Sequence, residues 1–188
     1  MLETERLARI RDELGHRPWH ELGVDDLARA AGLSRMTLHR RGVAKEDIAA
    51  GLRRLLADEH AAAALPALTA SEPADVRLGM ALRAVCAVEE RYLGIIEGLD
   101  ADRVNEVFHE PGEGEVLTRP AFTDALRRIL QDGVADGTLH PGADPAETAT
   151  LLFNAAGWTY RHMRTGHRWS VARASGRLAD LLVAGVRA

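Results

Sequence analysis

Apolar residues recur along most of the chain at intervals of three and four, which is the spacing of one face of an α-helix. Leu7, Ile10 and Leu14 share such a face, and Gly15 ends the helix that they predict. Further helices in the N-terminal part are predicted over residues 24–31, 34–41 and 45–63. No segment alternates apolar and polar residues in the way that predicts a β-strand. The pattern therefore predicts an all-α fold.

The C-terminal part contains predicted helices with apolar residues on more than one side, which is typical of buried helices. They cover residues 74–99, 120–136, 144–165 and 170–186. Pro66 and the sequence TASEP (69–73) indicate a break between the two parts. The segment HEPGEGEVLTRP (109–120) is predicted to be a loop, because it holds two prolines, two glycines and three glutamates.

Composition places the chain among ordinary globular proteins, with 188 residues, 46% hydrophobic and 28% charged. The single cysteine, Cys86, excludes a disulfide framework within one chain and favours a reducing, cytoplasmic setting. The N-terminal segment MLETERLARIRDELG is charged and amphipathic, so neither a signal peptide nor a membrane anchor is expected. We expect no membrane partner.

Charge is distributed unevenly along this acidic chain, whose net charge is −4. Residues 1–54 hold 11 Lys+Arg and 9 Asp+Glu, and are therefore slightly basic. This excess is too small to bind nucleic acid by charge alone. Any such binding must depend on the local sequence GLSRMTLHRRGVAKED (32–47), which carries four cations before its first acid. These cations are Arg35, Arg40, Arg41 and Lys45.

The same segment has the features of a helix-turn-helix. Gly32 provides a turn residue tolerant of positive φ, Ser34 can cap the next helix, and Leu38 points toward the core. The side chains that then face outward are Arg35, Met36, His39 and Arg40. The pattern predicts a helix-turn-helix with a basic outer face. An ordinary helical hairpin with a solvated charged face is the alternative.

The sequence DDLARAAGLSRMTLHRRGVAKEDI (25–48) resembles the tetracycline-repressor (TetR/AcrR) family of transcriptional regulators. That family usually has Ala-Gly-Val-Ser, two variable residues, Thr-Leu-Tyr, and then Lys-Glu at the start of the fourth helix. Residues 31–34, 37–39 and 45–46 occupy those places here. The match covers about the first quarter of the chain. It implies a three-helix DNA-binding domain over residues 1–45, joined by a linking helix to a helical ligand-binding and dimerisation domain over residues 46–188.

The resemblance also implies a function and its residues. The protein is expected to be a ligand-responsive repressor that binds a palindromic operator in double-stranded DNA as a homodimer, without a cofactor. The candidates for reading base edges are Arg35, Met36, Arg40 and Arg41. The candidates for phosphate contacts are Ser34, Thr37, His39 and Lys45.

Four positions depart from the family pattern. His39 replaces a tyrosine, Val24 replaces a threonine, and Ala44 replaces a Ser or Thr cap, where alanine caps poorly. Gly42 replaces a large apolar residue, often Phe. We expect Gly42 to remove a core contact and to loosen the end of the third helix, with Val43 able to pack in its place.

The C-terminal part offers candidates for two further sites. A pocket for an apolar small-molecule effector would be lined by Met80, Cys86, Tyr92, Ile95, Phe108, Phe122 and Trp158. A dimer interface would be formed by Leu151, Ala155, Trp158, Leu178, Leu181 and Leu182. For both sets, packing within one monomer is the alternative.

No pattern in the chain predicts an enzyme or a metal site. The eight histidines do not form an H-E-x-x-H motif, and neither G-x-S-x-G nor a phosphate-binding loop is present. The remaining alternative is a helical small-molecule-binding or interaction protein with a decayed DNA-binding head, of which Gly42 would be a symptom.

Overall fold

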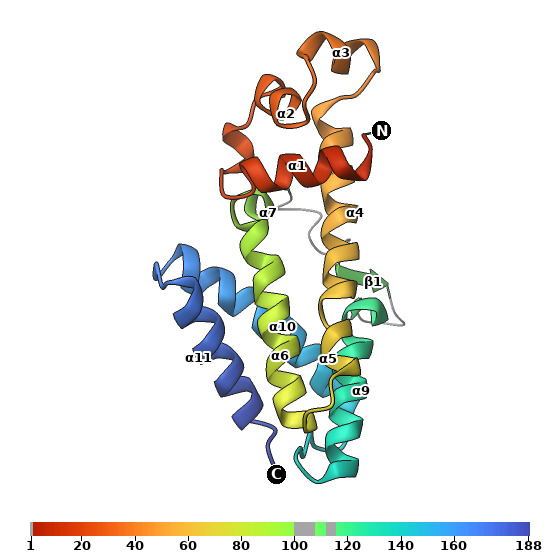
Figure 1. Cartoon of the computed structure of the whole chain (residues 1–188), viewed down its shortest axis with the longest axis vertical. Coiled ribbons are helices and arrows are strands. Elements are labelled where there is room, and N and C mark those ends of the chain that lie inside the picture. Colours follow the sequence, from red (N-terminus) through yellow and green to blue (C-terminus); the bar gives the residue numbers. More distant parts are fainter. Residues whose placement is uncertain (1, 100–107, 112–115) are drawn as a thin grey trace. The chain divides into compact units, whose positions relative to one another are not determined.

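The computed structural model describes residues 2–99, 108–111 and 116–188 (Figure 1). Contacts between Cα atoms divide the chain into two compact units. Unit 1 comprises Met1–Glu59 and Arg91–Phe108, and unit 2 comprises His60–Glu90 and His109–Ala188. Helix α4 (Lys45–Ala63) begins in unit 1 and ends in unit 2. The expected division at residue 45 stays a prediction.

Unit 1 consists of short helices around a leucine-rich core. After α1 (Thr4–Leu14) come the 3-10 helix η1 (Trp19–Glu21), α2 (Val24–Ala30), α3 (Arg35–Arg40), the start of α4, and α7 (Leu93–Leu99). The bounds of α2, α3 and α4 agree with the sequence prediction to within one residue, and α1 ends before Gly15 as predicted. Their apolar positions provide fully buried side chains, among them Ile10, Leu27, Leu38 and Leu52.

Two close approaches hold the elements of unit 1 together. A Cβ atom built on Gly51 of α4 would lie 2.8 Å from Cδ1 of Leu7, so α1 packs against α4 at a residue without a side chain. At the other end of α1, the main-chain oxygen of Gly15 accepts hydrogen bonds from the N–H groups of Gly94 (2.7 Å) and Ile95 (3.2 Å). These two bonds attach the start of α7 to the end of α1.

Unit 2 is a bundle of longer helices. It contains the end of α4, then α5 (Leu65–Thr69), α6 (Ala74–Arg91, whose last residue is in unit 1), α9 (Pro120–Asp136), α10 (Pro145–Thr165) and α11 (Val171–Ala184). Helix α10 packs against both α9 and α11. The predicted start of α10 is confirmed, because Oδ1 of Asp144 accepts a hydrogen bond from the N–H of Ala146 at 2.8 Å.

Three details differ from the sequence prediction. Pro66 lies in the first turn of α5, where proline is tolerated, and the break follows at residues 70–73. The helix expected over residues 74–99 is interrupted at Tyr92. The expected loop contains a short antiparallel ribbon of β1 (His109–Pro111) and β2 (Val116–Thr118), in which His109 pairs with Thr118. Strands of three residues are too short to produce a visible alternation in the sequence.

The all-α class is confirmed despite this ribbon, since helices form the body of both units. Within the described ranges, no helix is both long enough and apolar enough to pass through a bilayer.

Candidate functional site

Helices α2 and α3 of unit 1 form the predicted helix-turn-helix, and Gly32 makes the turn between them. Gly32 has a φ of 67° and donates its N–H to the oxygen of Arg29 at 2.9 Å. The next residue, Leu33, donates to the oxygen of Ala28 at 2.8 Å. This pair of bonds is a Schellman motif, in which a left-handed residue closes the last turn of a helix. The role predicted for Gly32 is therefore confirmed.

Gly42 ends α3 by the same motif, which corrects the expectation that it loosens this end. Its φ is 62°, its N–H donates to the oxygen of His39 at 3.0 Å, and Val43 donates to the oxygen of Leu38 at 3.1 Å. Val43 and Leu38 are both buried, as an apolar pair in this motif usually is. A Cβ atom at position 42 would meet nothing within 4 Å. The backbone conformation, rather than a lack of space, therefore favours glycine at this position.

Hydrogen bonds cap the N-termini of α3 and α4 by different means. Oγ of Ser34 accepts from the N–H of Thr37 at 3.1 Å, as predicted, and lies 2.9 Å from the Thr37 hydroxyl. Ala44 has no side-chain acceptor, but Oδ2 of Asp47 accepts from the N–H of Ala44 at 2.9 Å. The aspartate in the first turn thus provides a cap at α4 that alanine cannot.

The start of α2, where Val24 departs from the family pattern, is capped in the same way as α4. Oδ2 of Asp26 accepts from the N–H of Gly23 at 3.1 Å. This hydrogen bond holds the pKa of Asp26 below its ordinary value, and the nearby charges of Arg17 and Arg29 act in the same direction.

The outward face of α3 is cationic with one apolar side chain. Arg40 and Arg41 are exposed, and in the part of the chain that the structure describes neither makes an ion pair or a side-chain hydrogen bond. His39 is exposed as well. Arg35 differs, because one of its guanidinium nitrogens lies 3.3 Å from Oδ2 of Asp25. Met36 is 72% exposed. The face predicted from the sequence is thus directed away from the core.

Lys45 is held by groups of unit 1 that sequence reasoning did not connect with it. Its ammonium group donates to the main-chain oxygens of Trp19 (3.0 Å) and Leu22 (2.5 Å). The same nitrogen lies 4.8 Å from the centre of the Trp19 ring, a cation–π distance. These contacts attach the start of α4 to η1. The phosphate contact expected of Lys45 stays a prediction.

The seven candidates for an effector pocket are divided between the two units. Tyr92, Ile95 and Phe108 are buried in unit 1. The other four belong to unit 2, where Met80 and Trp158 reach the surface, with exposures of 38% and 55%. Met80 lines a pocket of about 310 Å³ beside α11. The assignment of these seven residues to an effector pocket stays a prediction.

Cys86 and Phe122 are interior residues of unit 2. Cys86 packs in a cluster with Tyr160, Ala174 and Leu178. Burial, together with the negative charge of Glu89, raises the pKa of the Cys86 thiol to about 12. The ring of Phe122 stacks on that of Phe153, with ring centres 5.4 Å apart.

A buried polar cluster in unit 2 was not predicted. Nε2 of His60 lies 3.1 Å from Oε1 of Glu89, and Nε of Arg161 lies 3.4 Å from Oε2. Burial raises the pKa of Glu89, but its interactions with His60 and Arg161 outweigh burial, so the pKa lies below its ordinary value. A Cβ atom at Gly157 would lie 3.1 Å from Oε1 of Glu89, so this glycine makes room for the carboxylate.

One signal for this cluster was present in the sequence. Leu78, Leu82 and Val85 form a predicted buried stripe on α6, and Glu89 continues that stripe four residues further on. An acid on the buried face of a helix requires a partner from another helix.

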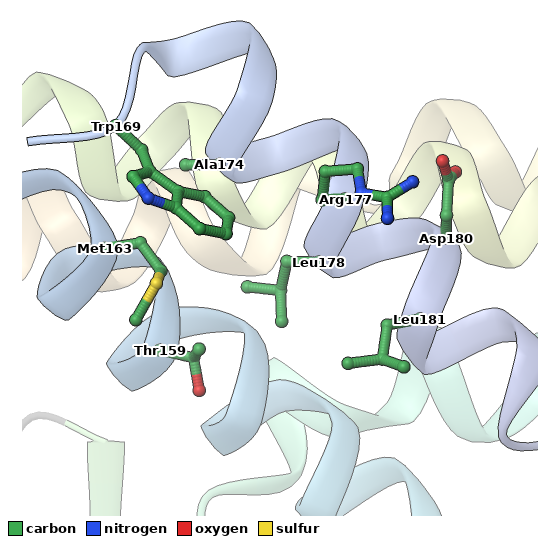
Figure 2. Close-up of a pocket in the computed structure, with 8 residues that line it drawn as sticks. All are labelled: Thr159, Met163, Trp169, Ala174, Arg177, Leu178, Asp180 and Leu181. Carbon is green, nitrogen blue, oxygen red and sulfur yellow. The ribbon is translucent and has the colours of Figure 1, made fainter. Parts of the chain in front are cut away.

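Three of the six candidates for a dimer interface lie on the exposed faces of α10 and α11. Leu151, Trp158 and Leu181 are exposed, whereas Ala155 and Leu182 are half-buried and Leu178 is buried. A pocket of about 470 Å³ lies between the two helices (Figure 2). In it, Leu178 and Leu181 of α11 face Thr159 and Met163 of α10, and Trp169 lies at one end.

Among the side chains that the structure describes, no group of three or more His, Cys, Asp or Glu residues is arranged to hold a metal ion.

No family model and no curated protein matches this sequence. Solved structures do resemble it along almost the whole chain. The TetR-family regulator PfmR from Thermus thermophilus is 22% identical with a TM-score of 0.65, and the match covers 95% of this chain and 97% of PfmR. A TetR/AcrR-family regulator from Thermobifida fusca is 21% identical with a TM-score of 0.64, over 97% of this chain and 94% of the regulator.

A third similar structure contains a ligand. FadR from Bacillus subtilis, in complex with stearoyl-CoA, is 15% identical with a TM-score of 0.67, and the match covers 97% of this chain and 98% of FadR. At these identities the likeness establishes the fold. The chain has the fold of TetR-family transcriptional regulators.

Proposed function

We propose that this protein is a sequence-specific DNA-binding transcriptional regulator, and more narrowly a ligand-responsive repressor. The observation that carries the proposal is the outward face of α3, where the exposed Arg40 and Arg41 have no acidic partner among the described residues. Arginine side chains of this kind can donate paired hydrogen bonds to guanine in the major groove.

The face of α3 is held in one orientation by its surroundings. Leu38 is fully buried, so the opposite side of the helix must point outward. The Ser34 cap fixes the first turn, and Gly42 fixes the last. A rigid helix suits a groove reader, since the backbone that carries the arginines does not have to be ordered on binding and only their side chains do.

A homodimer on a palindromic operator is part of the proposal. One α3 helix reads one half-site, and two-fold symmetry in the protein matches two-fold symmetry in the operator. The exposed Leu151, Trp158 and Leu181 on α10 and α11 support a second copy as the partner of this face. A self-complementary pairing would remove these apolar side chains from water.

We further propose an apolar small molecule as the effector. Unit 2 has an interior of leucine, alanine and phenylalanine side chains, and FadR, of similar fold, binds stearoyl-CoA. An effector of this kind would act by binding more tightly to the conformation that does not bind DNA. The proposal concerns binding rather than catalysis.

The alternative of a decayed DNA-binding head loses its main support. Gly42 was its symptom, and Gly42 ends α3 in a regular Schellman motif.

The decisive experiment is selection of duplexes from a random DNA library by the full chain, followed by footprinting of the enriched sequence. We expect an enriched palindrome, protected over two half-sites. Arg40→Ala and Arg41→Ala should each weaken binding to it. Arg128→Ala is the matched control, because Arg128 is a 70% exposed cation on α9 of unit 2. Recovery of random sequences with only salt-sensitive binding would overturn the proposal.

A further inference from the structure

Met36 is the single exposed large apolar side chain among the described residues of unit 1. An isolated exposed apolar residue is ordinary on protein surfaces, and by itself requires no explanation. Met36 differs because of its place. It lies in the first turn of α3, four residues before Arg40, so the two side chains are neighbours on one face of the helix.

The fold prevents Met36 from turning inward. Leu38, two residues further on, is fully buried and occupies the core side of α3. The hydrogen bonds of the Ser34 cap and of the Gly42 turn fix both ends of this six-residue helix. Met36 is therefore held on the same surface as the free guanidinium group of Arg40.

The chemistry of base edges provides one apolar group that such a surface can contact. In the major groove, guanine presents two acceptors, whereas thymine presents a C5-methyl group. Methionine is flexible, unbranched and polarisable, so its side chain can adjust to pack against a group as small as this methyl. The Cβ atoms of residues four apart on a helix lie about 5–6 Å from each other. Successive bases along one DNA strand are separated by about 3.4 Å. Met36 and Arg40 can therefore contact bases that are one or two steps apart.

We infer that each half-site contains a thymine whose methyl group packs on Met36, one or two base pairs from a guanine bound by Arg40. This inference rests on the proposed DNA-binding function and names the bases that the surface recognises.

The test removes the methyl group and nothing else. A duplex selected from the random library by the full chain is synthesised with thymine or with deoxyuridine at each thymine position in turn, and its dissociation constant is measured by fluorescence anisotropy. Wild-type protein should bind about fourfold more weakly when the contacted thymine of one half-site is replaced, the change for one buried methyl group.

Variants of the protein identify the side chain responsible. Met36→Ala should bind the thymine and deoxyuridine duplexes with equal dissociation constants. Met36→Leu should keep part of the difference in affinity between the two duplexes. Arg40→Ala should keep the methyl effect but lose its response to 7-deazaguanine, which lacks the N7 acceptor. Melting temperatures of the three variants check that α3 is still folded.

The outcomes separate the inference from the function on which it rests. A selected operator at which no deoxyuridine replacement weakens wild-type binding overturns the inference and leaves the DNA-binding function intact. A methyl effect of equal size in Met36→Ala overturns it as well. Selection that enriches no sequence overturns the proposed function, and the inference with it.

Discussion

The ammonium group of Lys45 lies 3.0 Å from the main-chain oxygen of Trp19 and 4.8 Å from the centre of the indole ring of the same residue. One side chain at the start of α4 thus contacts both the backbone and the ring of a residue in η1. A second hydrogen bond, to Leu22, extends this contact to the residue that follows η1. We regard Lys45 as a positioning residue, which sets where α4 begins relative to the helices before it.

Replacing Lys45 by methionine should therefore lower the stability of the protein. Two carbonyl oxygens lose a charged donor, and hydrogen bonds to charged groups contribute about 1.5–3 kcal/mol. We expect the free energy of unfolding, measured by urea denaturation, to fall by roughly 2 kcal/mol. Trp19→Leu keeps both carbonyl oxygens and removes only the ring. Its free energy of unfolding should therefore fall by less than that of Lys45→Met.

The salt dependence of DNA binding distinguishes positioning from a phosphate contact for Lys45. Loss of one phosphate contact lowers the slope of log affinity against log salt by about one. Because the ammonium group is engaged within unit 1, we expect Lys45→Met to keep the slope. A lower slope with unchanged stability would instead assign Lys45 to the phosphate backbone.

Gly42→Ala should destabilise the protein although it creates no clash. The added Cβ meets nothing within 4 Å, but the φ of 62° is unfavourable for an L-residue with a side chain, by about 1–2 kcal/mol. Gly176→Ala is the matched control, because its Cβ also meets nothing within 4 Å and lies within helix α11. There alanine should stabilise by roughly 0.5–1 kcal/mol. Equal effects of the two changes in chemical denaturation would contradict this account.

Leu181→Asp should shift the protein from dimer to monomer. Leu181 is 70% exposed on α11, and the proposed partner surface would have to bury the new charge. By two-fold symmetry each substitution occurs twice in the interface, so we expect dimer dissociation to rise at least about tenfold. Val134→Asp on α9 is the control, since Val134 is 56% exposed but lies outside α10 and α11. Sedimentation velocity over a concentration series measures both variants, and an equal response would place the interface elsewhere.

The buried carboxylate of Glu89 should make stability fall in acid. Its folded pKa lies below the ordinary value of 4.5, so its stabilising contribution is complete above about pH 4.5. This contribution is lost as the pH falls through the folded pKa. We expect Glu89→Gln to lack this part of the acid response, when unfolding free energies are compared from pH 7 to pH 3.

The same variant should be less stable at neutral pH, by on the order of 3 kcal/mol, because Arg161 would keep a buried charge without its carboxylate partner. The exposed Glu72, changed to Gln, is the control and should alter neither stability nor its acid response appreciably. An acid response identical in Glu89→Gln and wild type would exclude Glu89 as its source.

Those features of the fold that depend on local chemistry could be predicted from the sequence. The cap at Asp144, the turn at Gly32 and the burial of Leu38 each follow from a few neighbouring residues, and each is found in the structure. The same is true of the outward cations of α3, because burial of Leu38 fixes which side faces outward.

Features that depend on distant residues were missed. Nothing near Lys45 in the sequence indicates that Trp19, 26 residues earlier, provides its acceptor. The partners of Glu89 come from α4 and α10, so only the position of this acid on an apolar stripe was visible. Gly42 was misjudged for another reason: comparison with a family pattern indicated a missing side chain, whereas the physical requirement at this position is a left-handed backbone.

Lys45 is the only lysine in the chain, and its amine nitrogen is engaged by two carbonyl oxygens and an indole ring. The other 23 of the 24 residues that are lysine or arginine are arginines. The cations of α3 and its C-cap that are unpaired among the described residues, Arg40 and Arg41, are therefore guanidinium groups, which lysine acetylation cannot modify. Lysine acetylation, which weakens many cationic surfaces, thus has no target on the outward face of α3, and the one amine that it could modify is already held by Trp19 and Leu22.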